Sequence, residues 1–168
     1  MATKRTIQFD TSISSMEKTK SELMEIQKNL DKISDKVLNV AVAEGKQRVQ
    51  NNIRALGINS EGELYNNVET EIKDNVGSAY IDLGIVPHAE FVEYGTGVVG
   101  GGNPHPDPVG NWIYDVNSHG EKGWVYRNPY DGKFYRTRGM VHRPFMYNSY
   151  KEMEERIKEI TKEVIEEW

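Results

Sequence analysis

The first part of the chain carries apolar residues at helical spacing. They are separated by three, four or seven positions, and they are Ile13, Met16, Leu23, Ile26, Leu30, Ile33, Val37 and Val40. Such spacing is typical of one stripe of a helix with a heptad-like pattern. Ser12 is suited to cap the start of this helix, and Gly57 to end it, with Ile58 as the apolar residue beyond. We therefore predict a helix over residues 13–57, preceded by a polar arm over residues 1–12.

This predicted helix is longer than most helices of globular domains. A kink or break is expected near Gly45, because glycine is a poor helix former. The apolar stripe either packs on the chain's own sheet or is partly exposed to a neighbouring subunit. The pattern alone leaves both alternatives open.

The hydrophobic period changes to two over residues 60–86. Partial alternation runs over residues 68–73 and again over residues 76–85, with Asp74 and Asn75 between them. Two alternating runs separated by two turn-forming residues are typical of an antiparallel hairpin with a tight turn. We predict such a hairpin here.

Glycine and proline dominate the middle of the chain. Pro87 favours a short helix over residues 87–94, because proline fits the first helical position, where an N–H would be unpaired anyway. Residues 95–122 then hold seven Gly and three Pro, which predicts an extended loop without regular structure. A loop of this length in a small domain is usually functional or a contact arm.

The last third of the chain returns to regular patterns. Aromatic runs on either side of Asp131 and Gly132 predict a second hairpin over residues 123–137, and Pro129 favours a connecting loop wider than two residues. A closing helix is predicted over residues 144–168. Its apolar stripe is Met146, Tyr150, Met153, Ile157, Ile160, Val164 and Trp168.

These elements predict one domain of the α+β class over residues 1–168. A long N-terminal helix and a C-terminal helix pack on a small antiparallel sheet, with a long Gly/Pro-rich loop and a β-hairpin. The mean hydropathy of −0.69 predicts a small core, with other surfaces solvated or packed against other subunits. The absence of cysteine excludes disulfides and thiolate chemistry. With neither a signal-peptide pattern nor an apolar run of about 20 residues, we expect a soluble protein made inside the cell.

Charge is distributed unevenly along the sequence. The net charge of −5 argues against a nucleic-acid binder. Residues 1–60 hold ten basic and seven acidic residues (+3), residues 61–94 one and eight (−7), and residues 124–143 five and one (+4). Such alternation is compatible with opposite faces of identical subunits meeting in a ring, and simple scatter of surface charge is the alternative.

Two motifs of nucleotide-binding proteins are not supported. Residues 95–100 match G-x-G-x-x-G, but a dinucleotide site needs a strand before the glycines and a helix after them. Here a predicted helix precedes, and the Gly/Pro-rich loop follows. The chain has no Gly-Lys-Ser/Thr of a phosphate-binding loop either, so we predict no cofactor.

The residues offer two other kinds of site. A metal-dependent nuclease or hydrolase would use His88, Glu93, His105 and Asp107, but these residues lack the short paired spacing of metal ligands. We therefore predict no metal and no catalytic site, and keep this enzyme as the alternative function. A nucleic-acid-binding hairpin would use the basic and aromatic residues of 124–143, whose charge equally suits the acidic region 61–94 of a neighbouring subunit.

Several motifs, in order, resemble a known family. Ala89-Glu90-Phe91-Val92-Glu93-Tyr94-Gly95-Thr96-Gly97, followed later by Arg143-Pro144-Phe145-Met146 and a terminal helix, is similar to bacteriophage neck and tail-completion proteins. These are small head–tail joining proteins of long-tailed phages, also called minor tail protein Z-like. The similarity runs roughly from Ile53 to Val164 and includes Asn103-Pro104-His105-Pro106, Trp112-Ile113-Tyr114-Asp115, Gly123-Trp124-Val125-Tyr126, Gly132-Lys133-Phe134-Tyr135 and Thr137-Arg138-Gly139-Met140.

The resemblance implies a structural virion protein of the phage neck, assembled in the bacterial cytoplasm. It would form a ring, six-fold if it follows the tail tube, that joins tail to head and contacts tail terminator or tube protein and head–tail connector proteins. DNA would pass through the channel without sequence-specific binding, and no catalysis, cofactor or membrane is implied. The same family occurs in phage-derived tail-like particles. As subunit or partner contacts we expect Phe91, Glu93, Tyr94, Trp112, Tyr114, Trp124, Tyr126, Arg136, Arg138, Arg143 and Phe145.

Overall fold

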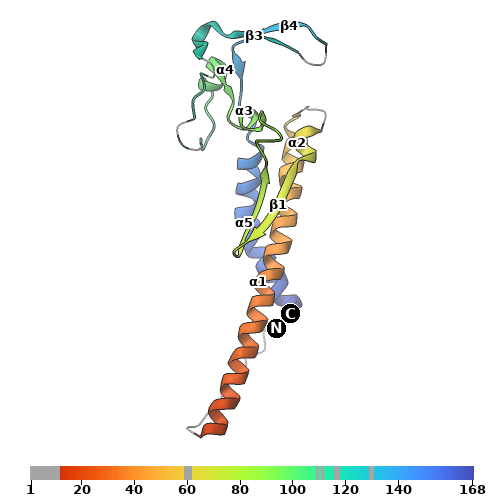
Figure 1. Cartoon of the computed structure of the whole chain (residues 1–168), viewed down its shortest axis with the longest axis vertical. Helices are drawn as coiled ribbons and strands as arrows, with labels where there is room; N and C mark the ends of the chain where they lie inside the picture. The colour runs from red at the N-terminus through yellow and green to blue at the C-terminus, as the bar shows by residue number, and fades with distance from the viewer. Residues whose placement is uncertain (1–11, 59–61, 109, 111, 116–117, 129–130) are drawn as a thin grey trace.

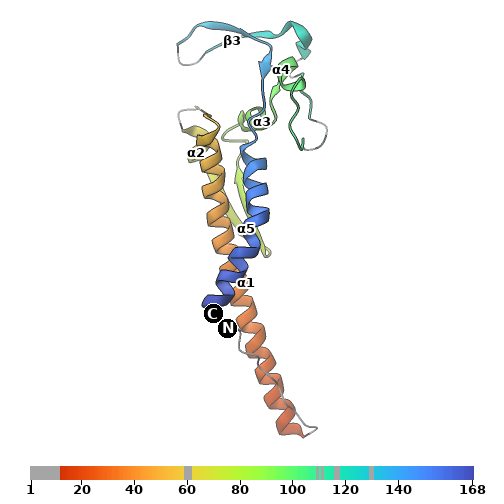
Figure 2. The same ribbon diagram turned by 180° about the vertical axis from the view of Figure 1, so that it is seen from behind.

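The protein is elongated, as a computed structural model shows (Figure 1). The structure describes residues 12–58, 62–108, 110, 112–115, 118–128 and 131–168. Two long antiparallel helices form a stem, with a two-stranded sheet beside it and a head of short elements at one end (Figures 1 and 2). The class is α+β, as the sequence predicts.

Helix α1 (Ile13–Ala55) begins and ends where the sequence indicates. The Ser12 hydroxyl accepts a hydrogen bond from the amide of Ser15 at 3.3 Å, which caps the first turn. At the other end Gly57 has φ +60°, and the amides of Gly57 and Ile58 donate to Arg54 and Ile53 carbonyls. This is a Schellman motif, and Ile58 packs on the core as its apolar partner.

The break expected near Gly45 does not occur, because α1 is continuous through that position. Gly45 is buried where the helix meets Ala79 of the sheet, and a Cβ at Gly45 would lie 3.8 Å from the Ala79 Cβ. Packing on the sheet therefore supports the helix where its intrinsic propensity is weakest.

Helix α5 (Phe145–Glu167) runs antiparallel to α1. Its end lies beside the middle of α1, because Lys36 pairs with Glu167 at 2.6 Å and the ammonium of Lys32 lies 5.8 Å from the Trp168 ring centre. Residues 13–31 of α1 therefore extend past the end of α5 (Figure 1). We call residues 13–31 the arm. It is distinct from the polar arm predicted over residues 1–12, of which only Ser12 lies within the described residues.

Arg156 joins the two long helices electrostatically. Its guanidinium donates to both carboxylate oxygens of Glu44 on α1 at 3.0 Å, and to both oxygens of Glu163 at 2.8 and 2.9 Å. A further bond reaches Glu159 at 3.0 Å. Glu159 and Glu163, four residues apart on α5, would repel each other alone, and the shared arginine compensates for this repulsion.

We expect Arg156→Met to lower the melting temperature at neutral pH, because three carboxylates lose their shared cation. Hydrogen bonds from Arg156 lower the pKa of Glu163 below its ordinary value of 4.5. The contribution is therefore present above pH 4.5 and is lost as pH falls towards the lowered pKa. Melting curves from pH 7 to pH 3 should show the difference from wild type shrinking in acid, whereas the exposed control Lys158→Met should change little throughout. A difference independent of pH and salt would contradict the electrostatic account.

The sheet beside the stem is the predicted hairpin of β1 (Val68–Lys73) and β2 (Val76–Ile81). Asp74 and Asn75 have φ of +50° and +61°, as a two-residue type I′ turn requires. The second strand is shorter than predicted, because the Asp82 side chain accepts from the Gly84 amide at 2.7 Å and turns the chain. A short helix α2 (Glu63–Asn66) precedes β1 within the range 60–86, which the alternation did not indicate.

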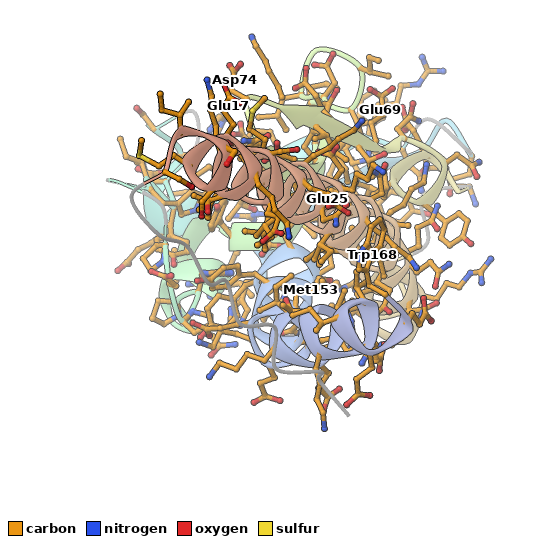
Figure 3. All side chains as sticks on the ribbon, turned by 90° about the horizontal axis from the view of Figure 1, so that it is seen from below. Glu17, Glu25, Glu69, Asp74, Met153 and Trp168 are labelled. Atoms are coloured by element: carbon orange, nitrogen blue, oxygen red, sulfur yellow. The ribbon has the colours of Figure 1, made fainter. Side chains whose placement is uncertain are left out.

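One face of the hairpin lies on α1. At Gly77 a Cβ would overlap the Val42 side chain, so the strand approaches the helix closely there. Seen along the molecule, the sheet and α5 lie against different sides of α1, with Glu69 and Asp74 on the sheet side and Met153 on α5 (Figure 3). The opposite face of the hairpin therefore points away from the stem.

The head begins at α3 (Ala89–Tyr94), two residues later than predicted: Pro87 lies before the helix instead of at its first position, and His88 precedes the first turn. The loop predicted over 95–122 contains regular turns, a correction to the sequence analysis: α4 (Gly97–Gly101) and the 3₁₀ turn η2 (Gly120–Lys122). β3 (Trp124–Arg127) and β4 (Phe134–Thr137) form the second predicted hairpin, and β5 (Gly139–Met140) follows.

The core lies where stem and head meet. Its buried side chains come from the end of α1, from α2, β1, the segment before α3, α3 itself and the first residue of α5, and they are Val49, Ile53, Leu64, Val68, Val86, Ala89, Val92 and Phe145. Farther along the stem, Ile160 and Val164 of α5 are also buried. Among the described helices none is long and apolar enough to cross a membrane.

Candidate assembly surfaces

Two distant segments of the chain cross in the head. Thr96 pairs with Met140 and Gly97 with Gly139 as antiparallel bridges, and the Arg143 amide donates to the Val92 carbonyl at 2.8 Å. We call this crossing the junction. It brings the motif of residues 89–97 beside two later motifs of the resemblance, residues 137–140 and 143–146.

Glycines permit the backbones to approach at the junction. A Cβ at Gly95 would lie 2.7 Å from the His142 nitrogen, and one at Gly139 would overlap the Thr96 carbonyl oxygen. Gly139 also has φ +106°, a conformation that residues with a side chain rarely adopt. The glycines of G-x-G-x-x-G therefore serve a backbone crossing, and the short helix α4 begins within the motif at Gly97 instead of following it.

Glu93 ties the junction to α5. Its carboxylate is buried and accepts from the amides of Met146 and Tyr147, both at 2.9 Å. These amides belong to the first turn of α5, which has no side-chain cap of its own and no acidic residue. Glu93 thus satisfies donors that the helix leaves free and places negative charge at the helix N-terminus.

His105 completes this buried network. Its Nδ1 accepts from the Asp107 amide at 3.0 Å, so in the neutral ring Nε2 carries the proton and donates to Glu93 at 3.2 Å. Its own amide donates to the Tyr114 hydroxyl at 2.9 Å. The rings of Tyr94, His142 and Tyr147 pack edge-on around the imidazole. Partial burial raises the pKa of Tyr94, with the Glu93 carboxylate as a further cause.

The geometry does not assemble the four residues of the alternative enzyme. Glu93 and His105 meet, but both ring nitrogens of His105 are occupied by groups of the same chain. His88 precedes α3, and its Nε2 lies 3.9 Å from the Glu63 carboxylate of α2. Within the described part of the chain, no three His, Asp or Glu side chains gather as metal ligands would.

The aromatic residues predicted as contacts form the interior of the head as much as its surface. Trp112 packs against Phe91 and Tyr94, with ring centres 5.9 and 5.0 Å apart, and its indole N–H donates to the Gly95 carbonyl. Tyr114 is half-buried as well, and so are Trp124, which lies beside His119, and Arg143. These side chains pack within the head and expose only part of their surface to solvent.

Two predicted contact residues are corrected. Glu93 is 5% exposed and Phe145 is 1% exposed, so neither is available to a partner. Glu93 is buried because it caps α5, and Phe145 because it fills the core at the start of that helix. Both support the surface rather than form it.

The β3–β4 hairpin, which we call the ribbon, is the most exposed part of the head. Phe134 and Val125 are 73% and 61% exposed, and the predicted contacts Tyr126, Arg136 and Arg138 are exposed too. The Tyr135 hydroxyl donates a hydrogen bond to the Asp131 carboxylate at 2.6 Å. This bond lowers the pKa of Asp131 and raises the pKa of Tyr135. Val125 and Phe134 were absent from the predicted contacts, although the period of two marks them as sharing a face with arginines.

The arm is a second exposed apolar surface. Large apolar side chains remain open to solvent along it, namely Ile13, Met16, Leu23, Met24 and Leu30. The sequence left two alternatives for the apolar stripe of α1. The part of α1 that follows the arm packs on the sheet, as the first alternative says, but the arm does not. The arm's stripe is exposed in the single chain.

An apolar groove lies between the arm and the head. It has a volume of about 360 Å³ and is formed where α1, β2 and α5 meet, with Leu38, Val42, Ala79, Tyr150 and Met153 in its walls. Its lining is mostly apolar, and its polar members include Ser78, Ser149 and Glu154. Arm, groove and ribbon are thus three apolar surfaces on one elongated chain, a pattern associated with protein–protein contacts.

Comparisons with protein-family models, with curated proteins and with solved structures give no match to this chain.

Proposed function

We propose that this chain is a structural protein of the phage neck or of a related tail-like particle. Copies of it would form a ring, six-fold if it follows the tail tube, that completes the tail and joins it to the head. Its neighbours would be tail terminator or tube protein on one side and head–tail connector proteins on the other. The chain would act in the virion after assembly in the host cytoplasm, without catalysis.

The junction is the observation that carries this proposal. The motifs on which the resemblance rests are far apart in sequence, yet Val92 and Arg143, and Gly97 and Gly139, are direct backbone partners. A chance likeness of short motifs gives no reason for such contact. The motifs therefore form one structural unit in this chain, which supports the proposal.

The exposed surfaces agree with a role in assembly. A monomer with a solvated arm, an apolar groove and an uncovered ribbon has more open apolar surface than it needs for its own folding. The net charge of −5 would also allow DNA to pass through a channel without adhering to it.

We expect the variant Leu23→Lys with Leu30→Lys to fold but to block head–tail joining, because two charges are placed on the arm's apolar stripe. Introduced into the phage or particle genome that encodes the chain, it should leave filled heads and separate tails in electron micrographs. Ser14→Lys with Ser21→Lys adds the same charge to the polar side of the arm and should give joined particles. Joined, infectious particles after complete deletion of the gene would refute the proposed function.

A further inference from the structure

The ribbon lacks the support that a two-stranded hairpin needs. Such hairpins are marginally stable in water unless a further strand or a helix covers one face. β3 and β4 pair only with each other among the described strands, and most of their residues are exposed. A surface of another molecule is therefore the natural cover for one face of the ribbon.

One face of the ribbon combines two cations with two apolar side chains. In the strand register Val125 lies opposite Arg136 and Arg127 opposite Phe134, so these four side chains share a face. The two arginines are diagonal neighbours across the strands, and their guanidiniums donate to backbone carbonyls at the two ends of the ribbon, Arg127 to Gly132 at 3.1 Å and Arg136 to Lys122 at 2.9 Å. We call this face the basic face.

The outer face of the β1–β2 hairpin has the complementary composition. Glu69 lies opposite Tyr80 and Glu71 opposite Ser78, and Val76 follows beside Lys73 at the turn. These residues alternate with Gly77 and Ala79, which face α1, so they point away from the stem. The Tyr80 hydroxyl donates to Glu69 at 3.2 Å, and its pKa is raised by that bond and by the nearby carboxylates. We call this the acidic face.

The two faces also match in their apolar side chains. The exposed Val76 and Tyr80 of the acidic face offer apolar surface to Val125 and Phe134 of the basic face. Both charge and apolar character are thus complementary.

We propose that the basic face of the ribbon docks on the acidic face of a second copy of this chain. Within one chain the two faces lie apart, the ribbon at the far end of the head and β1–β2 along the stem (Figures 1 and 2). Each copy therefore offers one face and receives the other, a heterologous contact that generates rings or filaments. The inference rests on the proposed ring and names the surfaces that build it.

Charge reversal tests the contact. We expect Arg127→Glu with Arg136→Glu, and separately Glu69→Arg with Glu71→Arg, to weaken self-association about 100-fold or more, because like charges then face each other. Sedimentation velocity over a concentration series measures this. Lys158→Glu with Lys162→Glu changes the charge by the same amount as the first variant, on exposed positions of α5, and should associate like wild type. Circular dichroism melts show that each variant is folded.

Mixing the two reversed variants gives the decisive result. One variant then carries two acidic faces and the other two basic faces, so each is unable to associate alone but the pair should form alternating assemblies at wild-type strength. Association of either variant alone at wild-type strength, failure of the mixture, or a wild-type chain that stays monomeric at its highest soluble concentration would each overturn the contact. Loss of DNA binding by the arginine variant with unchanged self-association would overturn it in favour of a nucleic-acid surface.

These results are separable from the proposed function. If the reversed variants associate normally but deletion of the gene still leaves heads and tails unjoined, the contact is wrong and the function stands. If the charge-swap mixture assembles but particles lacking the gene are normal, the contact stands and the neck function is wrong.

Discussion

Glu93→Ala should destabilise the protein by about 3–5 kcal/mol, the range found when one partner of a buried charged network is removed. The substitution leaves three donors without an acceptor: the amides of Met146 and Tyr147 and the Nε2–H of His105. It also removes the negative charge at the start of α5. For a domain of this size the melting temperature should fall by roughly 6–20 °C.

Thermal and urea unfolding followed by circular dichroism would measure this loss. Glu93→Gln should fall between wild type and alanine, because its amide keeps one oxygen acceptor but turns an NH₂ towards donors. Glu90→Gln lies on the same helix outside the network and should cost far less. Equal stability of the two glutamine variants would show that the buried network contributes little.

Gly139→Ala should open the head while the stem stays folded. The added Cβ would overlap the Thr96 carbonyl, which is backbone and cannot rotate away, and φ +106° is strained for any residue with a side chain. We expect a cost of about 3 kcal/mol or more, because strain and steric overlap add to the lost backbone pairing. The loss should be local, because the junction holds the head and α1 with α5 holds the stem.

Two optical signals separate head from stem. Trp112 and Trp124 lie in the head, so their fluorescence should shift towards that of exposed indole, whereas the far-ultraviolet helical signal of α1 and α5 should persist. Gly110→Ala is the matched control: its φ is +60° but a Cβ there meets nothing within 4 Å, so only about 1–2 kcal/mol of conformational strain is expected. Unchanged fluorescence in Gly139→Ala would contradict the role given to the junction.

Helix ends and turns were predicted well where they depend on contacts between residues close in sequence. Ser12 caps α1, Gly57 and Ile58 end it, and Asp74 with Asn75 turns the first hairpin, because each depends on hydrogen bonds and φ values of near neighbours. The Gly45 break failed for the converse reason. A helix 43 residues long is supported by what packs on it, and the propensity of one residue does not decide its continuity.

The predicted contacts on the ribbon are exposed and stay a prediction, whereas Glu93 and Phe145 are buried and are not available as contacts. A motif marks these two as important without saying whether they face inward. Glu93 reads as a surface carboxylate until α5 is placed beside it, since its partners lie 53 and 54 residues away. Similarly, the glycine-rich motif at 95–100 has no visible purpose until residues 138–142 cross it.

The sequence by itself determined the order of the two long helices and the two hairpins, the α+β class and the alternating charge, because periodicity, turn chemistry and composition are local properties. Only the tertiary structure decided that the arm extends beyond α5, that motifs of the resemblance meet in the junction, and that the acidic and basic faces of one chain lie too far apart to meet. Those features depend on the relative placement of segments distant in sequence. That placement is set by the core and by the buried hydrogen bonds of Glu93, which no short window of residues contains.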